Sequence, residues 1–483
     1  MQARRTKIVA TLGPATDDPA ALEQLLLAGV NVVRLNFSHG SVKEHRQRAE
    51  QVRTLAEKHQ LNIAILGDLQ GPKIRIARFK EGKVRLETGQ DFTLDSQRAK
   101  DSGDSEAVAV DYPDLIRDCA CSDILLLDDG RIQMEVIDTS ASALHCRVLN
   151  GGVLSDNKGI NKLGGGLSAP ALTEKDKQDI ETAVALDLDY LAVSFPRSEE
   201  DLLIARKLID QAGGRCELVA KIERAEVVRD DAVLDAIILA SDAIMVARGD
   251  LGVEIGDAAL IGSQKKIIRR AVELNRVVIT ATQMMESMID NPMPTRAEVF
   301  DVANAVLDGT DAVMLSAETA AGKHPVATVQ AMACIIAGAE EDISTRTSHH
   351  RLNLAFTDID ETIAMATMYA ANHSTGIKAV ICMTETGKTT RLLSRINSGL
   401  PILALTRHPR TARRAALYRG VETVQFDTEH IPNAEINQRA VDELKRQGIV
   451  TNGDRVLITK GDYINAQGGT NTLKIVTVGQ PIH

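Results

Sequence analysis

Eight short apolar segments alternate with helix-like segments along the first two thirds of the chain. An order of strand, helix, strand, helix is typical of a parallel sheet. Eight such units predict an α/β fold built on a closed (β/α)8 barrel, a TIM barrel, whose functional groups lie at the C-terminal ends of the strands. The eight apolar runs begin at Lys7, Val32, Ala64, Tyr190, Val219, Val246, Val277 and Ala312.

Opposite charges lie at the ends of two of these runs. The fifth run contains Lys221 and Glu223, and the sixth leads into Arg248 and Asp250. Buried charge is costly unless it is paired or bound to a ligand, so these groups predict a site for a metal ion and an anionic substrate. One such charge alone could equally serve to solvate a loop. Six of the runs end in polar residues, however, and we expect these on one face of the barrel.

The size and charge of the chain exclude several classes of protein. Its 483 residues correspond to about three domains. A net charge of −10, with five Tyr, seven Phe and no Trp, offers neither a basic groove nor base-stacking platforms, so we expect no nucleic-acid partner. The apolar stretch near the N-terminus breaks at Gly13-Pro14, too early for a signal peptide or a membrane span. We therefore expect a cytoplasmic protein with no membrane partner.

The six cysteines show no zinc-binding spacing and are far from the strand ends in the sequence. We expect reduced, packed thiols. A metal clip at Cys119-Ala120-Cys121 is the alternative.

The chain divides into a barrel with an insertion and a separate C-terminal part. We expect residues 1–70 to form the first part of the barrel, 71–169 an inserted, barrel-like all-β domain, 170–345 the second part of the barrel, and 346–483 an open α/β domain. An insertion after a barrel strand hangs over the mouth of the barrel and predicts a lid that excludes water. A passive insertion is less favoured, because both of its ends, at 70–75 and 156–159, are basic and contain glycine.

One turn in the C-terminal part has the composition of a phosphate site. Residues 384–389, Thr-Glu-Thr-Gly-Lys-Thr, follow an apolar run and open a helix. Hydroxyl groups, a glycine and a lysine at a helix N-terminus favour phosphate binding. The turn lacks Walker spacing, and a plain strand-to-helix turn is equally compatible with it.

Four motifs resemble those of one enzyme family. They are residues 34–40 (Arg-Leu-Asn-Phe-Ser-His-Gly), 245–252 (Met-Val-Ala-Arg-Gly-Asp-Leu-Gly), 281–288 (Ala-Thr-Gln-Met-Met-Glu-Ser-Met) and 294–298 (Pro-Thr-Arg-Ala-Glu). Over nearly its whole length the chain resembles the pyruvate kinase family, in the bacterial form that responds to AMP or sugar phosphates. The resemblance implies phosphoryl transfer from phosphoenolpyruvate to ADP, giving pyruvate and ATP in the last step of glycolysis. It also implies a requirement for Mg²⁺, or Mn²⁺ in its place.

The resemblance also implies roles for particular residues. Arg34 and Lys221 face the phosphoryl group, and Glu223 and Asp250 bind the metal. The backbone amides of Gly249 and Asp250 bind the substrate carboxylate. Thr282 is the hydroxyl that matches protonation of the enolate, together with Ser316, Glu318 and water, and the resemblance does not identify which group donates the proton. The implied nucleotide-binding residues are Asn36, Ser38, His39, Arg75 and Lys158.

For the C-terminal part, the resemblance implies an effector site and an assembly. The effector phosphate would meet Thr384, Glu385, Thr386, Gly387, Lys388 and Thr389, and a loop from Gly461 to Asn471, with Gly468 and Gly469, would close over it. Which phosphorylated metabolite binds there cannot be read from the sequence. Members of the family usually form homotetramers.

One position departs from the commonest pattern of the family. Potassium-dependent members have an Asp-Thr pair after the third strand and an acidic residue four positions beyond the Thr, whereas this chain has Asp68-Leu69 and then Lys73. The potassium site that Asn36, Ser38 and Asp68 would share is thus one ligand short, and Lys73 brings a charge of its own. We expect the enzyme not to require K⁺; the alternative is that Lys73 is a solvated residue at the lid hinge.

Two other functions are compatible with such a barrel. A metal-dependent lyase or aldolase also stabilises a pyruvate enolate, but it needs no nucleotide lid carrying Arg75 and Lys158. A metabolite sensor without catalysis is disfavoured because the expected catalytic set is present: Lys221, Glu223, Asp250 and Thr282.

Overall fold

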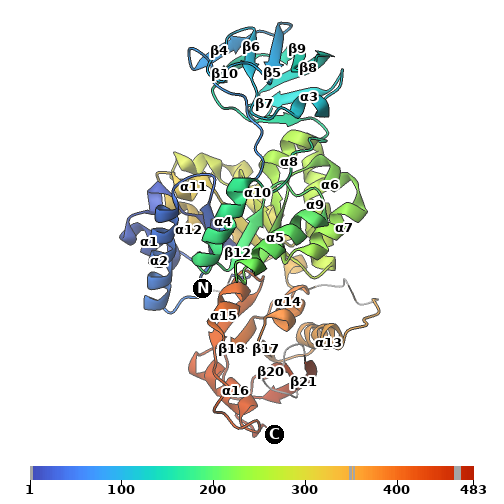
Figure 1. Ribbon diagram of the computed structural model, residues 1–483. Coiled ribbons are helices and arrows are strands. Elements are labelled where there is room, and N and C mark those ends of the chain that lie inside the picture. The colour runs from blue at the N-terminus through green and yellow to red at the C-terminus, as the bar shows by residue number, and fades with distance from the viewer. Residues whose placement is uncertain (1–3, 348–350, 352–353, 462–468, 483) are drawn as a thin grey trace.

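The computed structural model describes residues 4–347, 351, 354–461 and 469–482. Three bodies lie in a row, with the barrel in the middle, the β domain at one end and the C-terminal domain at the other (Figure 1). The chain passes from the barrel into the β domain and back again before it enters the C-terminal domain.

Eight parallel strands close the barrel in the order β1-β16-β15-β14-β13-β12-β3-β2. Each of the eight apolar runs is one of these strands, so the predicted barrel is confirmed. The strands are β1 (Lys7–Thr11), β2 (Val32–Asn36), β3 (Ala64–Asp68), β12 (Tyr190–Val193), β13 (Glu217–Ile222), β14 (Ala243–Ala247), β15 (Val277–Ala281) and β16 (Ala312–Leu315).

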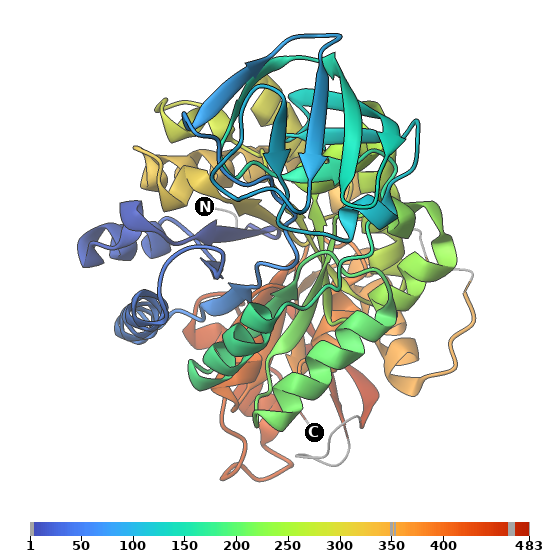
Figure 2. The ribbon, with the colours of Figure 1, turned by 45° about the horizontal axis from the view of Figure 1, so that its top comes forward.

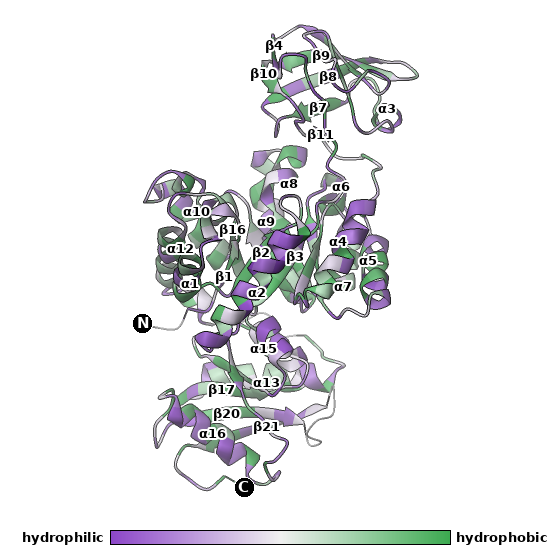
Figure 3. Cartoon of the chain, turned by 60° about the vertical axis from the view of Figure 1, so that its left-hand side comes forward, coloured by the Kyte–Doolittle hydropathy of each residue, from purple (hydrophilic) through white to green (hydrophobic). Residues whose placement is uncertain are grey.

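Amphipathic helices surround these strands and bury their apolar faces against them (Figure 3). Several helices begin at a side-chain cap, as α4 does at Thr173, whose hydroxyl accepts the amide of Asp176. The long helices are α1 (Pro19–Leu27), α2 (Val42–Lys58), α4 (Glu174–Ala185), α5 (Glu199–Gln211), α7 (Asp231–Ala240), α9 (Asp257–Glu273), α10 (Arg296–Leu307) and α12 (Pro325–Ala339). Short helices α6 (Ala225–Arg229), α8 (Arg248–Ile255) and α11 (Ala317–Ala320) follow β13, β14 and β16, and 3-10 turns occupy Pro14–Thr16, Glu286–Ile289 and Ile343–Thr345.

The inserted domain is a curled β structure that stands over the mouth of the barrel (Figure 2). One sheet has the order β11-β7-β8-β9-β5-β6, and β10 pairs with β4. Its elements are β4 (Lys83–Leu86), β5 (Asp91–Asp95), β6 (Ala107–Ala109), α3 (Leu115–Asp118), β7 (Ile124–Leu127), β8 (Ile132–Thr139), β9 (Ala143–Asn150), β10 (Gly152–Ser155) and β11 (Ile160–Lys162). A separate apolar core fills the domain.

The C-terminal domain is an open sheet with helices on its faces. Its strand order is β19-β18-β17-β20-β21, and only β21, at the edge, is antiparallel to its neighbour. The elements are α13 (Ile359–His373), β17 (Ile377–Met383), α14 (Lys388–Ser394), β18 (Ile402–Thr406), α15 (Pro409–Ala415), β19 (Val421–Gln425), α16 (Ile436–Arg446), β20 (Arg455–Gly461) and β21 (Thr470–Thr477).

Buried ion pairs join this domain to the N-terminal ends of the barrel strands. Arg395, just after α14, forms an ion pair with Asp311, and both side chains are buried. Asp189, at the start of β12, binds Arg53 of the barrel and Arg413 of α15. The opposite end of the barrel is therefore left for the lid. Among the described helices, none is both long enough and apolar enough to cross a membrane.

Candidate active site

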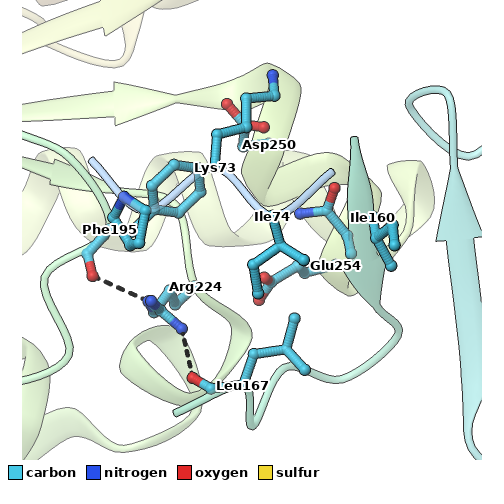
Figure 4. A pocket seen from close by; sticks show the side chains of 10 residues that line it. Lys73, Ile74, Ile160, Leu167, Phe195, Arg224, Asp250 and Glu254 are labelled. Atoms are coloured by element: carbon cyan, nitrogen blue, oxygen red, sulfur yellow. Dashed lines mark hydrogen bonds between the residues drawn. The ribbon is translucent and has the colours of Figure 1, made fainter. Parts of the chain in front are cut away.

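A cavity of about 540 Å³ lies between the lid and the C-terminal ends of the barrel strands. The lid contributes residues from Lys73 to Leu163, and the barrel contributes α8 and Gln283. A smaller pocket beside the lid hinge is lined by Lys73, Phe195, Arg224, Asp250 and Glu254 (Figure 4).

The carboxylate of Asp68, at the end of β3, holds two cations from other strands. Arg34 of β2 donates from Nε to Oδ2 at 2.6 Å, and the ammonium of Lys221 on β13 lies 3.3 Å from Oδ1. Asp68 is 1% exposed. Three strands are thus joined by charge at the floor of the site.

The ammonium of Lys221 has two more oxygen partners. It lies 2.9 Å from Oε1 of Glu223 and donates to the hydroxyl of Ser194 at 2.7 Å, and that hydroxyl donates to the carbonyl of Leu69. The other oxygen of Glu223 accepts the amide of Phe195 at 2.7 Å. The positions of both side chains are therefore fixed before any substrate binds.

The pairing controls which of these groups are charged. Burial alone would raise the pKa of the Asp68 carboxyl, but Lys221 and Arg34 outweigh it and hold that pKa below its usual range. Burial alone would lower the pKa of Lys221, but Asp68 and Glu223 raise it well above its usual range. The pKa of Glu223 rises to about 7 because burial dominates, with Lys221 opposing the rise and the charge of Asp250 adding to it.

Thr282 stands on a strained turn against α8. Its backbone φ is +69°, and that of Gln283 is +52°; a β-branched residue with positive φ is a genuine outlier that functional sites tend to contain. The hydroxyl of Thr282 accepts the amide of Gly249 at 2.7 Å and donates to the carbonyl of Ala281 at 2.6 Å. The turn thus aligns the first turn of α8, where Gly249 and Asp250 lie.

A bidentate ion pair holds this turn in place. Arg248 binds both oxygens of Asp301 on α10, at 2.7 and 2.8 Å, and donates to the carbonyl of Thr282 at 2.7 Å. Such a planar, forked contact supplies geometric precision as well as energy.

Glu318 is buried behind β16 and ties two loops together. It accepts the amide of Ser316 at 2.6 Å and the amide of Met285 at 3.3 Å. Since Met285 follows the turn at Thr282 in the chain, Ser316 and Glu318 belong to the same wall of the barrel mouth as Thr282.

The expected nucleotide-binding residues fall into two groups. Asn36, Ser38 and His39 form one turn after β2, in which the side chain of Asn36 accepts the amide of Ser38 and contacts His39. Arg75 and Lys158 lie side by side on the lid, where Arg75 donates to the carbonyl of Asn157 and Lys158 is paired with Asp128 at 2.7 Å. The two groups lie on different domains.

Two carboxylates fit a hard divalent cation. Glu223 and Asp250 are near enough for the charge of Asp250 to raise the pKa of Glu223, and oxygen ligands of this kind suit Mg²⁺, which keeps water and substrate oxygens as its other ligands. No cluster of three or more His, Cys, Asp or Glu side chains with metal-site geometry occurs in the described part of the chain. A pair of carboxylates that relies on the substrate for further ligands is consistent with that finding.

Lys73 projects from the lid hinge toward Asp250 (Figure 4). No ion pair within 4 Å joins it to Asp68 or to any other described residue. Leu69 is buried, and its carbonyl accepts the hydroxyl of Ser194.

The turn at 384–389 is largely occupied by contacts within the protein. Lys388 is paired with Asp360 of α13 at 2.7 Å, Glu385 contacts His408 and Arg407, and the hydroxyl of Thr389 contacts that of Thr470. Gly387 has φ +85°, and its amide donates to the hydroxyl of Thr384. The effector loop expected from Gly461 to Asn471 has its residues 462–468, including Gly468, outside the described residues.

Several of the positioning residues were missed by the sequence analysis. Ser194 and Phe195 follow β12 and contact Lys221 and Glu223, and Asp301 binds Arg248 from 53 positions away in the sequence. Only the polar end of the fourth apolar run could have signalled Ser194. No sequence feature near Asp301 predicts that its carboxylate binds Arg248.

Comparisons with known proteins agree over both parts of the chain. The family descriptions "Pyruvate kinase, barrel domain" and "Pyruvate kinase, alpha/beta domain" match residues 3–329 and 361–476. The chain is 58% identical to pyruvate kinase II of Salmonella typhimurium over 475 residues (98% of this chain, 99% of that one), and 57% identical to the pyruvate kinase of Haemophilus influenzae over 469 residues (97% of each). A crystal structure of a pyruvate kinase from Cryptosporidium parvum superposes with a TM-score of 0.90 at 32% identity, covering 98% of this chain and 96% of that one. The chain belongs to the pyruvate kinase family, whose members transfer a phosphoryl group from phosphoenolpyruvate to ADP and generally require a divalent cation.

Proposed function

We propose that Lys221 and Arg34 are the groups that stabilise the phosphoryl group as it moves from phosphoenolpyruvate to ADP. The observation that carries this proposal is the network at the floor of the cleft, where Asp68, Glu223 and Ser194 hold the ammonium of Lys221. Phosphoryl transfer is catalysed mainly by positioning and by charge that faces the transferring group. A cation fixed in advance costs no reorganisation during the reaction.

We propose that Glu223 and Asp250 hold the divalent cation. When bound, Mg²⁺ would neutralise charge on the enolate oxygen that remains after the phosphoryl group departs. The amides of Gly249 and Asp250 at the start of α8 would bind the substrate carboxylate, a common use of a helix N-terminus. Thr282, aligned with Gly249, would hold the proton that the enolate carbon takes up, with Ser316 and Glu318 on the same wall.

The nucleotide would be held from both sides of the cleft. Asn36, Ser38 and His39 would contact its phosphates from the barrel, while Arg75 and Lys158 would approach with the lid. Lys158 would exchange its contact with Asp128 for one with a phosphate.

Replacement of Lys221 by Met tests the central role in this proposal. The methionine keeps the length of the stem and removes the charge, and loss of a cation aimed at transition-state charge costs about 3 kcal/mol, or about a hundredfold in kcat. Lys207→Met, which removes an exposed lysine of α5, should leave kcat unchanged. If purified Lys221→Met keeps its thermal midpoint and more than about a tenth of wild-type kcat, Lys221 does not have this role.

We further propose that Lys73 makes the enzyme independent of K⁺. Lys73 is a positive charge on the wall of the cleft beside Asp250 (Figure 4), and Leu69 offers no side-chain oxygen to a monovalent cation. With an effective dielectric constant of about 20, a unit charge about 5 to 6 Å from a phosphoryl group contributes about 3 kcal/mol. This is comparable with the contribution of a bound K⁺ at the same distance.

The K⁺ proposal is tested by replacing KCl with a bulky quaternary ammonium salt at constant ionic strength. Wild-type activity should change little, whereas Lys73→Glu should lose most of its activity and recover part of it with K⁺. Lys73→Met separates loss of the cation from repulsion between the new carboxylate and Asp250. A wild-type enzyme that falls about tenfold or more without K⁺ would refute the proposal.

We propose that the turn at 384–389 binds a phosphorylated effector, as in the form of the family that responds to AMP or sugar phosphates. The hydroxyl groups of Thr384, Thr386 and Thr389 and the amides of Gly387 and Lys388 would surround the phosphate. Arg407 already balances the charge of Glu385, and the ring of His408 contacts the same carboxylate. Lys388 would turn from Asp360 toward the ligand.

Lys388→Gln tests the effector site without introducing repulsion against the buried Asp360. Activation by sugar phosphates and nucleoside monophosphates should disappear, while turnover at saturating substrate survives. Asp360→Asn, which removes the ion pair and keeps the lysine, should retain activation. Activation curves that are unchanged in Lys388→Gln across a panel of such metabolites would show that the phosphate binds elsewhere.

We also propose a cytoplasmic homotetramer. Large apolar side chains are exposed on the chain by itself at Ile261, Met293 and Phe300, each more than 60% accessible, and β21 presents an edge of the C-terminal sheet. Such surfaces are typical of subunit contacts.

A further inference from the structure

The return segment, residues 163–173, leads from the lid back to the barrel between β11 and α4. It contains three consecutive glycines with left-handed backbones. The φ angles of Gly164, Gly165 and Gly166 are +88°, +78° and +94°. Other residues adopt such angles only at a cost, and glycine loses much conformational freedom when it is ordered. The three residues therefore form the natural hinge of the return segment.

This hinge is bound to the two short helices beside the proposed metal ligands, α6 and α8. The amide of Gly164 donates to the carbonyl of Glu254 on α8 at 2.8 Å, and Arg229 of α6 donates to the carbonyl of Gly164 at 2.9 Å. The buried carboxylate of Glu254 accepts the amide of Ala225 at 2.8 Å and so ties α8 to α6. Glu223 lies two residues before the start of α6, and Asp250 lies in α8.

Arg224, adjacent to Glu223 in the chain, makes the central contacts. Its guanidinium is buried and donates to the carbonyls of Leu167 at 2.8 Å and Phe195 at 2.9 Å (Figure 4). It also donates to the carbonyl of Ala169 at 3.3 Å, which lies with Leu167 on the return segment. The guanidinium carbon also lies 5.7 Å from the centre of the Phe195 ring. One side chain therefore fixes both the residues that follow the glycines and Phe195, two residues after the end of β12.

Phe195 is the link to the metal site. Its backbone has φ +54°, and its amide donates to Oε2 of Glu223 at 2.7 Å. Because Arg224 binds the carbonyl of Phe195 and also lies over its ring, it restrains from both its carbonyl and its ring the residue whose amide orients the Glu223 carboxylate. Outer contacts of this kind commonly change metal affinity about 10- to 100-fold when they are lost.

We propose that Arg224 is a positioning residue that couples the lid hinge to the divalent-cation site. The proposal rests on the role of Glu223 as a metal ligand. Arg224 confines bending to Gly164–Gly166 by fixing Leu167 and Ala169, and through Phe195 it keeps Glu223 aimed at the cation while the lid opens and closes. Loss of Arg224 should therefore weaken cation binding and nucleotide binding together.

Arg224→Lys tests this coupling, because lysine keeps the charge but lacks the planar fork that serves three carbonyls. Binding of Mn²⁺ is measured directly by electron paramagnetic resonance, without turnover, together with kcat, the KM for ADP and the thermal midpoint. We expect an Mn²⁺ Kd about tenfold higher and a higher KM for ADP. Arg229→Lys is the matched control: it perturbs the same segment at Gly164 without touching Phe195, so its Mn²⁺ affinity should stay within about twofold of wild type.

Two further measurements distinguish a failure of the proposed coupling from a failure of the metal-ligand role of Glu223. If Glu223→Gln loses Mn²⁺ affinity while Arg224→Lys keeps it within about twofold of wild type, the proposed coupling is wrong and the metal-ligand role of Glu223 stands. If Glu223→Gln binds Mn²⁺ as wild type does, the metal-ligand role itself is wrong. Should Arg224→Lys fail to fold, hydrogen exchange of the wild-type enzyme decides. Addition of Mn²⁺ should slow exchange in peptides covering 164–170 together with those covering 194–197, and unchanged exchange at 164–170 would overturn the proposal.

Discussion

The carboxylate of Asp68 is the contact on which the rest of the site depends. It is buried at the end of β3 and binds Arg34 from β2 and Lys221 from β13. A buried carboxylate with one partner removed would leave an uncompensated charge, which is strongly destabilising. With both partners present, two cations are held at the floor of the cleft, where an anionic substrate can exchange part of their pairing for its own.

The same contact explains where the lid is attached. The chain leaves the barrel directly after Asp68, passes Lys73, and returns through a glycine hinge bound to α6 and α8. Those helices follow β13 and β14, and Glu223 and Asp250 lie just beyond the ends of these two strands. The lid, the glycine hinge and the carboxylates of Glu223 and Asp250 are therefore neighbours in space, because β3, β13 and β14 end on the same face of the barrel.

Much of the fold could be predicted because parallel barrel strands are continuous apolar runs with polar ends. The β domain was harder: β6, β10 and β11 have only three or four residues, and the last three residues of β8, from Ile137 to Thr139, are exposed. The C-terminal part was predicted to be an open α/β domain, and it contains an open five-stranded sheet, because its central strands β17, β18 and β20 are largely apolar and buried.

The site could be predicted only in part, because its supporting contacts join residues that are distant in the chain. Lys221 and Glu223 stand out as charges within a buried strand, but the Arg248 to Asp301 pair and the positive φ of Thr282 leave no local signal. The pairing of Lys388 with Asp360 was missed for the same reason. The composition of this turn is typical of an open phosphate site, but in the structure its lysine is already paired with Asp360.

The most direct test of the account is the kcat of Asp68→Asn, measured at saturating substrates and Mg²⁺ with the thermal midpoint as a check on folding. We expect kcat to fall about a hundredfold or more, because Arg34 and Lys221 lose the charge that fixes them. Asp235→Asn, which removes a carboxylate paired with Arg270 on the outer helices, should leave kcat unchanged. A folded Asp68→Asn enzyme that retains more than about a third of wild-type kcat would contradict the claim that this contact organises the site.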